Sequence, residues 1–83
     1  MESSVVKWRF NAGAWSSAIR DAVERSDVET VAIVCNVDIT TIGGWSKMYK
    51  SSWGKYPYPS MTSFVTVVRE LDLDPRDFWE LDL

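Results

Sequence analysis

The chain has 83 residues, 46% of them hydrophobic, with nine basic and twelve acidic side chains, no histidine and one cysteine. This length and apolar content predict one small domain with a packed core. The composition excludes an intrachain disulfide, histidine-dependent catalysis and a zinc site built from several thiolates.

Residues 1–10 form an N-terminal arm in which Trp8 and Phe10 alternate with Lys7 and Arg9. A period of two is typical of a β-strand. The arm is therefore a short strand, a dimer contact or a basic extension lying on DNA. We favour simple packing of Trp8 and Phe10 against the domain, which takes up residues 11–83.

A first helix is predicted from Ala12 to Ser26, with Asn11 as its N-cap. Its apolar positions recur with a helical spacing that forms one stripe: Trp15, Ile19, Ala22 and Val23. A second helix is predicted from Val28 to Cys35, capped by Asp27, and the run of Val31, Ile33, Val34 and Cys35 predicts that it is largely buried. The lone Cys35 is expected to be a buried, inert thiol.

A third helix is predicted after Asp38 and ends near Lys47 or Tyr49. Its spacing separates two faces. The face toward the core holds Ile42, Trp45 and Tyr49, whereas the face toward solvent or a ligand holds Thr40, Gly43, Gly44 and Lys47. Two glycines inside a helix cost roughly 1 kcal/mol each relative to alanine, so we expect them to permit close approach to a partner surface.

Residues 50–59 form a loop rich in serine, glycine, proline and aromatic side chains. Lys50 and Lys55 indicate phosphate contacts. For the aromatic side chains Trp53, Tyr56 and Tyr58 we consider three roles: packing on the domain, forming a dimer interface, or flanking a DNA backbone.

Two more helices are predicted after this loop. The first runs from about Met61 to Leu71 with Ser60 as its N-cap, and its expected apolar stripe is Phe64, Val65, Val68 and Leu71. The second is short and begins with Asp74 and Pro75. Two roles are open for the apolar side chains that follow, Phe78, Trp79 and Leu81: they close the core, or they form a dimer interface.

Residues 28–47 predict a helix-turn-helix unit. Ala32 is small enough to lie where two helices cross closely, Asn36 tolerates the left-handed conformation of the turn, and Ile42 and Trp45 face inward from the next helix. The second helix of such a unit normally enters the major groove of DNA.

The element order resembles the phage-repressor and Cro type of helix-turn-helix domain, the Xre family, from about Ala18 to Trp79. The similarity rests on Ala32, Ile42, Trp45 and the segment PSMTSFVTVVRELDLDPRDFW. It implies an all-α domain of four to five helices, of the lambda-repressor-like type, with a short N-terminal arm or strand. It also implies a homodimer that binds palindromic double-stranded DNA. Because the sequence shows no membrane span and no signal peptide, we expect the protein in the cytoplasm, associated with the nucleoid.

The same resemblance implies which residues contact DNA. The expected base contacts are Ile39, Thr40, Gly43, Gly44 and Lys47, and the expected phosphate contacts are Thr41, Lys50 and Lys55. Lysine can donate to guanine or to a phosphate, threonine can hydrogen-bond either one, and isoleucine can pack on a thymine methyl.

Charge leaves an alternative open. The net charge of −3 and the pI of about 4.7 are unusual for a nucleic-acid binder. However, residues 39–69 contain basic side chains and no acidic ones. This segment includes the expected DNA-reading helix, the loop after it and the next helix. The alternative is a protein-interaction module, antirepressor-like or antitoxin-like, that keeps this fold without DNA binding and uses Trp53, Tyr56, Tyr58 or Trp79. We expect no enzyme activity, cofactor, metal or membrane span.

Overall fold

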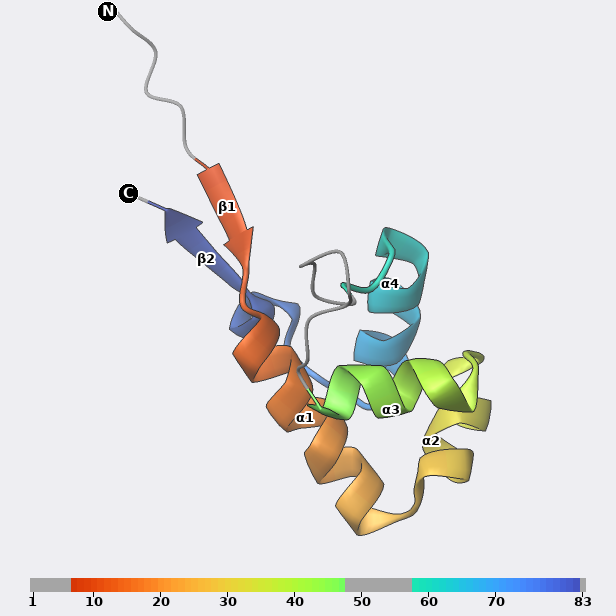
Figure 1. Cartoon of the computed structure of the whole chain (residues 1–83). Helices are drawn as coiled ribbons and strands as arrows, with labels where there is room; N and C mark the ends of the chain where they lie inside the picture. Colours follow the sequence, from red (N-terminus) through yellow and green to blue (C-terminus); the bar gives the residue numbers. More distant parts are fainter. Residues whose placement is uncertain (1–6, 48–57, 83) are drawn as a thin grey trace, which may run out of the picture.

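Four α-helices and a two-stranded ribbon make up the part of the chain that the computed structural model describes, residues 7–47 and 58–82 (Figure 1). The fold is compact and mostly helical. In chain order the elements are β1 (Lys7–Phe10), α1 (Ala12–Arg25), α2 (Val28–Cys35), α3 (Ile39–Lys47), α4 (Met61–Glu70), the 3₁₀ helix η1 (Pro75–Phe78) and β2 (Trp79–Asp82).

The helix starts follow the predicted caps. The side chain of Asn11 accepts a hydrogen bond from the Ala14 N–H, that of Asp27 from Thr30 and that of Ser60 from Ser63. Each of these bonds satisfies a donor that the first helical turn leaves without a partner. The predicted positions of these helices are confirmed to within one residue.

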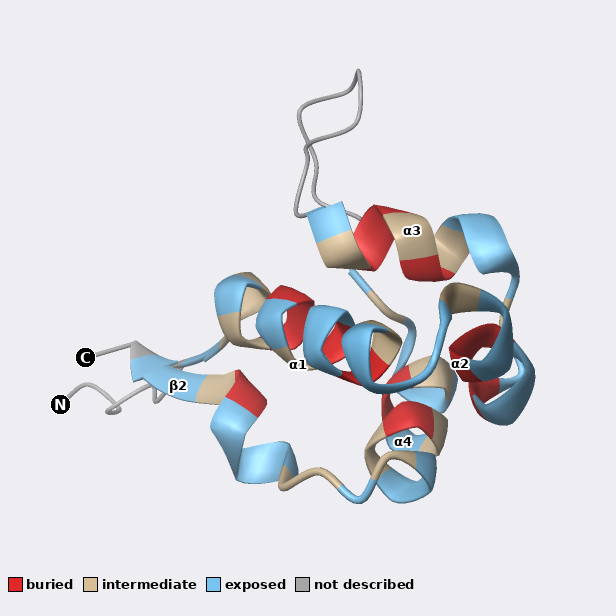
Figure 2. Ribbon diagram, turned by 90° about the horizontal axis from the view of Figure 1, so that it is seen from below, coloured by how far each residue is buried: buried red, intermediate tan, exposed pale blue. Residues whose placement is uncertain are grey.

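The core lies between α1, α2, α3 and α4. In Figure 2 the ribbon is red at the buried residues, which lie on the helix sides that face one another. Ile19 of α1, Ile42 of α3 and Val67 of α4 are completely buried, and burial of such side chains contributes about 1.5–3 kcal/mol each. Cys35 is buried as expected, and burial raises the pKa of its thiol, with a further rise from the charge of Glu70.

Aromatic rings connect the helices to the ribbon. Trp15 stacks on Phe64 with ring centres 5.5 Å apart and meets Trp45 and Phe78 edge-on at 5.3 Å each. Phe10 lies 5.7 Å from Trp15 and 5.1 Å from Trp79. The expectation that Phe10 packs on the domain is therefore confirmed, whereas Trp8 is 62% exposed.

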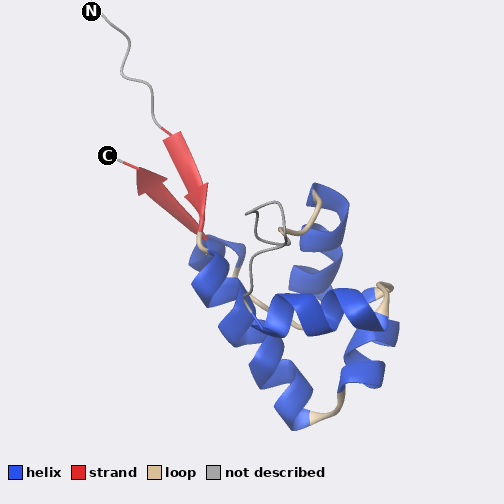
Figure 3. Cartoon of the chain, viewed as in Figure 1, coloured by secondary structure: helices blue, strands red, loops and turns tan. Residues whose placement is uncertain are grey.

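The short last helix begins with Asp74 as its cap and Pro75 in its first turn, as predicted, although it is a 3₁₀ helix, and the residues after it were not predicted to form a strand. After one short 3₁₀ turn, residues 79–82 extend as β2 and pair antiparallel with β1, so that Phe10 lies opposite Trp79 and Trp8 opposite Leu81 (Figure 3). Leu81 therefore lies on a strand instead of closing the helical core. The alternation of polar and apolar residues in 79–82 carried this signal, but four residues are too few to distinguish a strand from a helix.

Two predicted helix faces also need correction. On α2, Val31, Ala32 and Cys35 face inward, while Ile33 is 79% exposed and Val34 41% exposed, so this helix is not largely buried. On α4, Val67 takes the inward position expected for Val65, which is 50% exposed. In α2 the continuous apolar run of residues 31–35 hid the helical period, and in α4 valines at both 65 and 67 left two choices for the inward position.

No helix among the described residues combines the length and apolar character needed to cross a membrane.

Candidate functional site

The turn between α2 and α3 fixes the relation of these two helices. Asn36 adopts the left-handed conformation, with φ 56° and ψ 46°, and ends α2 as predicted. The next residue, Val37, donates its backbone N–H to the carbonyl of Ala32 at 3.0 Å. This is the hydrogen-bond pattern of a left-handed C-cap. It turns the chain sharply, so α3 packs back across α2.

Asp38 caps the start of α3. Its carboxylate accepts hydrogen bonds from both the backbone N–H and the hydroxyl of Thr40, at 3.0 Å each. The hydrogen bond from the Thr40 backbone holds the pKa of Asp38 below its usual value, and that from the Thr40 hydroxyl adds to the effect. A negative charge at this end of the helix also suits the helix dipole.

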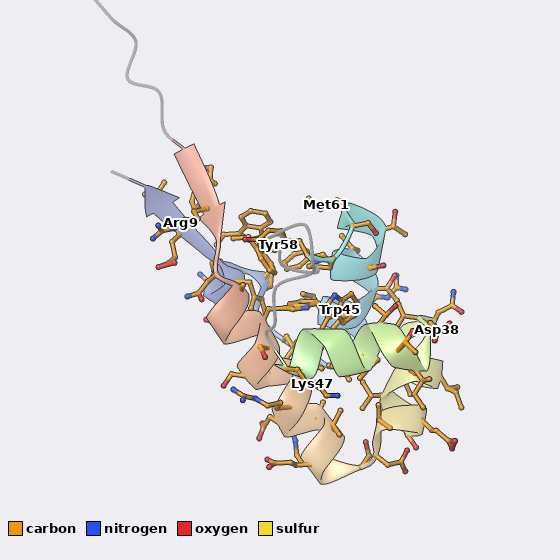
Figure 4. All side chains as sticks on the ribbon, viewed as in Figure 1. Arg9, Asp38, Trp45, Lys47, Tyr58 and Met61 are labelled. Carbon is orange, nitrogen blue, oxygen red and sulfur yellow. The ribbon has the colours of Figure 1, made fainter. Side chains whose placement is uncertain are left out.

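The inner face of α3 is formed by Ile42 and Trp45, both buried. Ile39, Thr40 and Lys47 are exposed, and a Cβ atom added at Gly43 would meet no atom within 4 Å. Figure 4 shows Asp38 and Lys47 near opposite ends of α3. The predicted separation of an inner and an outer face thus holds for these positions.

Gly44 is the exception. Predicted on the outer face as a base contact, it is buried. Its position follows Gly43 by 100° around the helix, which turns it toward the packed side. We therefore remove Gly44 from the set of residues that can touch a ligand.

A hydrogen bond between side chain and backbone ties α3 to α1. The buried hydroxyl of Ser16 donates to the backbone carbonyl of Ser46 at 3.1 Å. The Ser46 hydroxyl in turn donates to the carbonyl of Gly43 at 2.9 Å. Sequence reasoning did not identify Ser16, because a serine within an apolar stripe gives no sign of its partner.

The arginines are mostly neutralised by nearby acids. Ion pairs of 2.9–3.8 Å join Arg9 to Glu80, Arg25 to Asp21, Arg69 to Glu70 and Arg76 to Asp74. Lys47, in the last turn of α3, is the single basic residue of this helix over its described length. No carboxylate of the described residues lies within 4.0 Å of it. Its charge is therefore available to an anionic partner.

The remaining predicted site residues have different positions. Thr41 is half-buried at the start of α3. Tyr58 is 57% exposed and meets Phe10 edge-on, with ring centres 5.7 Å apart, while Trp79 is half-buried against Phe10 and Phe64. Lys50, Lys55, Trp53 and Tyr56 lie outside the described residues.

A groove at the turn was missed by the sequence analysis. It runs between α2 and the start of α3, and its lining includes the exposed Ile33 and Ile39 together with Glu29 and Asp38. Two exposed isoleucines beside two acids suit an apolar partner more than a phosphate. Ile33 lies about 100° around the helix from Ala32, which is consistent with exposure, but the angle at which α2 and α3 pack decides it.

No group of three or more acidic or cysteine side chains in residues 7–47 and 58–82 is arranged to hold a metal ion. The chain matched no family model, no curated protein and no solved structure.

Proposed function

We propose that this protein is a sequence-specific regulator that binds double-stranded DNA as a homodimer and inserts α3 into the major groove. The observation that carries the proposal is the α2–α3 unit. Its left-handed turn at Asn36 and the buried Ile42 and Trp45 direct Ile39, Thr40 and Lys47 away from the core. An α-helix presented in this way has the shape that the major groove admits.

The cap of α3 limits which bases its first turn can read. Since the Thr40 hydroxyl donates its proton to Asp38, its lone pairs remain free to accept a hydrogen bond. The Asp38 carboxylate is an acceptor as well. In the major groove, the donors are the amino groups of adenine and cytosine. We therefore expect adenine or cytosine opposite the start of α3.

Other residues supply different contacts. Ile39 is 42% exposed beside this cap and can pack on a thymine methyl. Lys47, at the far end of α3, can donate to guanine or to a phosphate. Gly43 has open space in front of it, which allows the helix backbone to approach the bases. Thr41, Lys50 and Lys55 remain proposed phosphate contacts.

Selection of bound sites from a random DNA library at about 0.1 M salt tests the proposal, because phosphate contacts weaken steeply as salt rises. Enrichment of a palindrome with adenine or cytosine at fixed positions is the expected result. Recovery of no motif by a folded sample would reject the function.

The matched variants Lys47→Glu and Arg69→Glu separate a contact from a change in net charge. Each replaces one exposed cation by an anion, but Arg69 lies on α4 and is paired with Glu70. We expect Lys47→Glu to abolish binding and Arg69→Glu to leave most of it. Loss of one phosphate contact also lowers the salt slope by about one. Equal effects of the two variants would reject the assigned role of α3.

A second candidate function is favoured by the groove at the turn. Its exposed Ile33 and the acids Glu29 and Asp38 suit a protein partner that brings apolar and basic side chains. An interaction module of this kind should lose its partner when Ile33 is changed to serine. It should also bind without the strong salt dependence of DNA contacts.

A further inference from the structure

The two-stranded ribbon has one apolar face. Side chains alternate along a strand, and residues directly opposite one another on paired strands share a face. The register therefore places Trp8, Phe10, Trp79 and Leu81 on one face of β1 and β2. Arg9 and Glu80 lie on the other face, where they form an ion pair of 3.8 Å.

The inner part of the apolar face is covered and the outer part is not. Phe10 and Trp79 pack toward the helices and meet Phe64 at 6.0 and 5.9 Å. Farther along the ribbon, Trp8 is 62% exposed and Leu81 is 47% exposed. Figure 1 shows that the ribbon projects beyond the helices at this end.

A groove adjoins the exposed part of this face. It lies between the ribbon and η1 and is lined by Trp8, Pro75, Arg76 and Trp79. The guanidinium of Arg76 is held by the Asp74 carboxylate at 2.9 and 3.1 Å, and the surface of the groove is almost wholly apolar. One chain therefore offers both a large apolar side chain, Trp8, and an apolar groove, so two copies can each insert the side chain into the groove of the other.

We propose that the apolar face of the β1–β2 ribbon, with Trp8 and Leu81 at its centre, packs against the same face of a second copy of this chain. Around a two-fold axis, Trp8 of each copy enters the groove between the ribbon and η1 of the other. The Arg9–Glu80 pair stays in water. A two-fold axis requires each contact to occur twice, which this arrangement provides.

Charge argues against the competing arrangement, in which strand edges join. Antiparallel pairing of β1 with β1 of a second copy, in the register centred on Arg9, would place Arg9 opposite Arg9. Pairing of β2 with β2, centred on Glu80, would place Glu80 opposite Glu80. Like charges on neighbouring strands are destabilising. Edge pairing would also leave Trp8 and Leu81 in water.

The available area predicts a weak dimer. Trp8 and Leu81 still expose 62% and 47% of their surface, so with Pro75 and Trp79 the face offers about 300–400 Å² per copy. Two copies then bury about 600–800 Å² of apolar surface and about 1,000 Å² once a polar rim is included, the lower end for a specific interface. We expect a dissociation constant in the micromolar range. The α2–α3 unit lies away from the ribbon and stays accessible (Figure 1).

Sedimentation equilibrium of the full chain without DNA, from about 1 µM to 1 mM, tests this proposal across the expected range. Trp8→Ala and Leu81→Glu should each weaken dimerisation at least tenfold. The matched control is Val65→Ala, which shortens an apolar side chain of similar exposure, 50%, on α4. Circular dichroism establishes that each variant is folded.

Three results would overturn the proposal: a monomer at 1 mM, an oligomer that grows beyond two, or a dimer that Trp8→Ala weakens no more than Val65→Ala does. Each is independent of DNA. Because the homodimer is part of the proposed function, failure here would remove the dimer from that proposal and leave only the role of α3 on DNA. A dimer that selects no DNA motif would do the reverse.

Discussion

The hydroxyl of Ser16 in α1 donates to the backbone carbonyl of Ser46 in α3 at 3.1 Å, inside a core that is otherwise apolar. This carbonyl lies in the last turn of α3, where carbonyls have no partner within the helix. The hydrogen bond therefore satisfies a group that would be costly to bury and sets where α3 crosses α1.

Ser16→Ala should lower the free energy of unfolding by about 1 kcal/mol, the usual net worth of such a bond, and by more if the Ser46 carbonyl stays dry. Urea unfolding of this variant and of Ser17→Ala, the exposed neighbour, measures the difference. An equal stability for the two variants would contradict a structural role for Ser16.

Ala32→Leu should destabilise the protein by about 1–3 kcal/mol or unfold it, because a larger side chain does not fit where α2 meets α3. Ala32 is 5% exposed, and its carbonyl accepts the turn hydrogen bond from Val37. Thr30→Leu, an exposed change on the same helix, serves as the control. A normal melting temperature for Ala32→Leu would mean that α2 and α3 do not cross there.

Gly43→Ala should raise the free energy of unfolding by up to about 1 kcal/mol, since alanine favours a helix and the added Cβ meets no atom. Gly44→Ala should lower stability instead, because Gly44 is buried. Thermal melts of the two variants and of the unchanged protein measure both differences in stability. If α3 approaches DNA as proposed, Gly43→Ala also weakens DNA binding while it stabilises the fold. Unchanged affinity would place Gly43 away from the DNA.

Asp38→Asn should change how stability depends on pH. The folded-state pKa of Asp38 lies below its reference value of 3.8, so this carboxylate stabilises the fold above that pH and loses its effect as pH falls through the lowered value. Asparagine caps a helix about as well and does not titrate in this range. Melting temperatures at pH 7 and pH 3 should therefore differ less in the variant. Identical shifts would show that the charge of the Asp38 carboxylate makes no contribution to stability.

Local patterns predicted the helices well because their signals are local. Caps such as Asn11 and Asp27 act within three residues of their partners, and Asn36 specifies a left-handed turn by its own conformational preference. The inner face of α3 followed from the spacing of Ile42 and Trp45. These features depend on one segment at a time.

Features that depend on two distant segments were not predictable in this way. β2 forms because residues 79–82 find β1, and nothing within four residues specifies that partner. The burial of Gly44 and the exposure of Ile33 both depend on the angle at which neighbouring helices pack. The partner of Ser16 is thirty residues away in sequence.

The ribbon has a consequence for the order of folding. The helices form from contacts between near neighbours, whereas β1 and β2 come from opposite ends of the described chain. Closing so long a loop in an extended chain is entropically costly, and the folded helices shorten the distance that remains. We expect strand pairing to be the last step of folding and the first to reverse. The backbone amides of 7–10 and 79–82 should then exchange their hydrogens faster than those around Ile19 and Ile42.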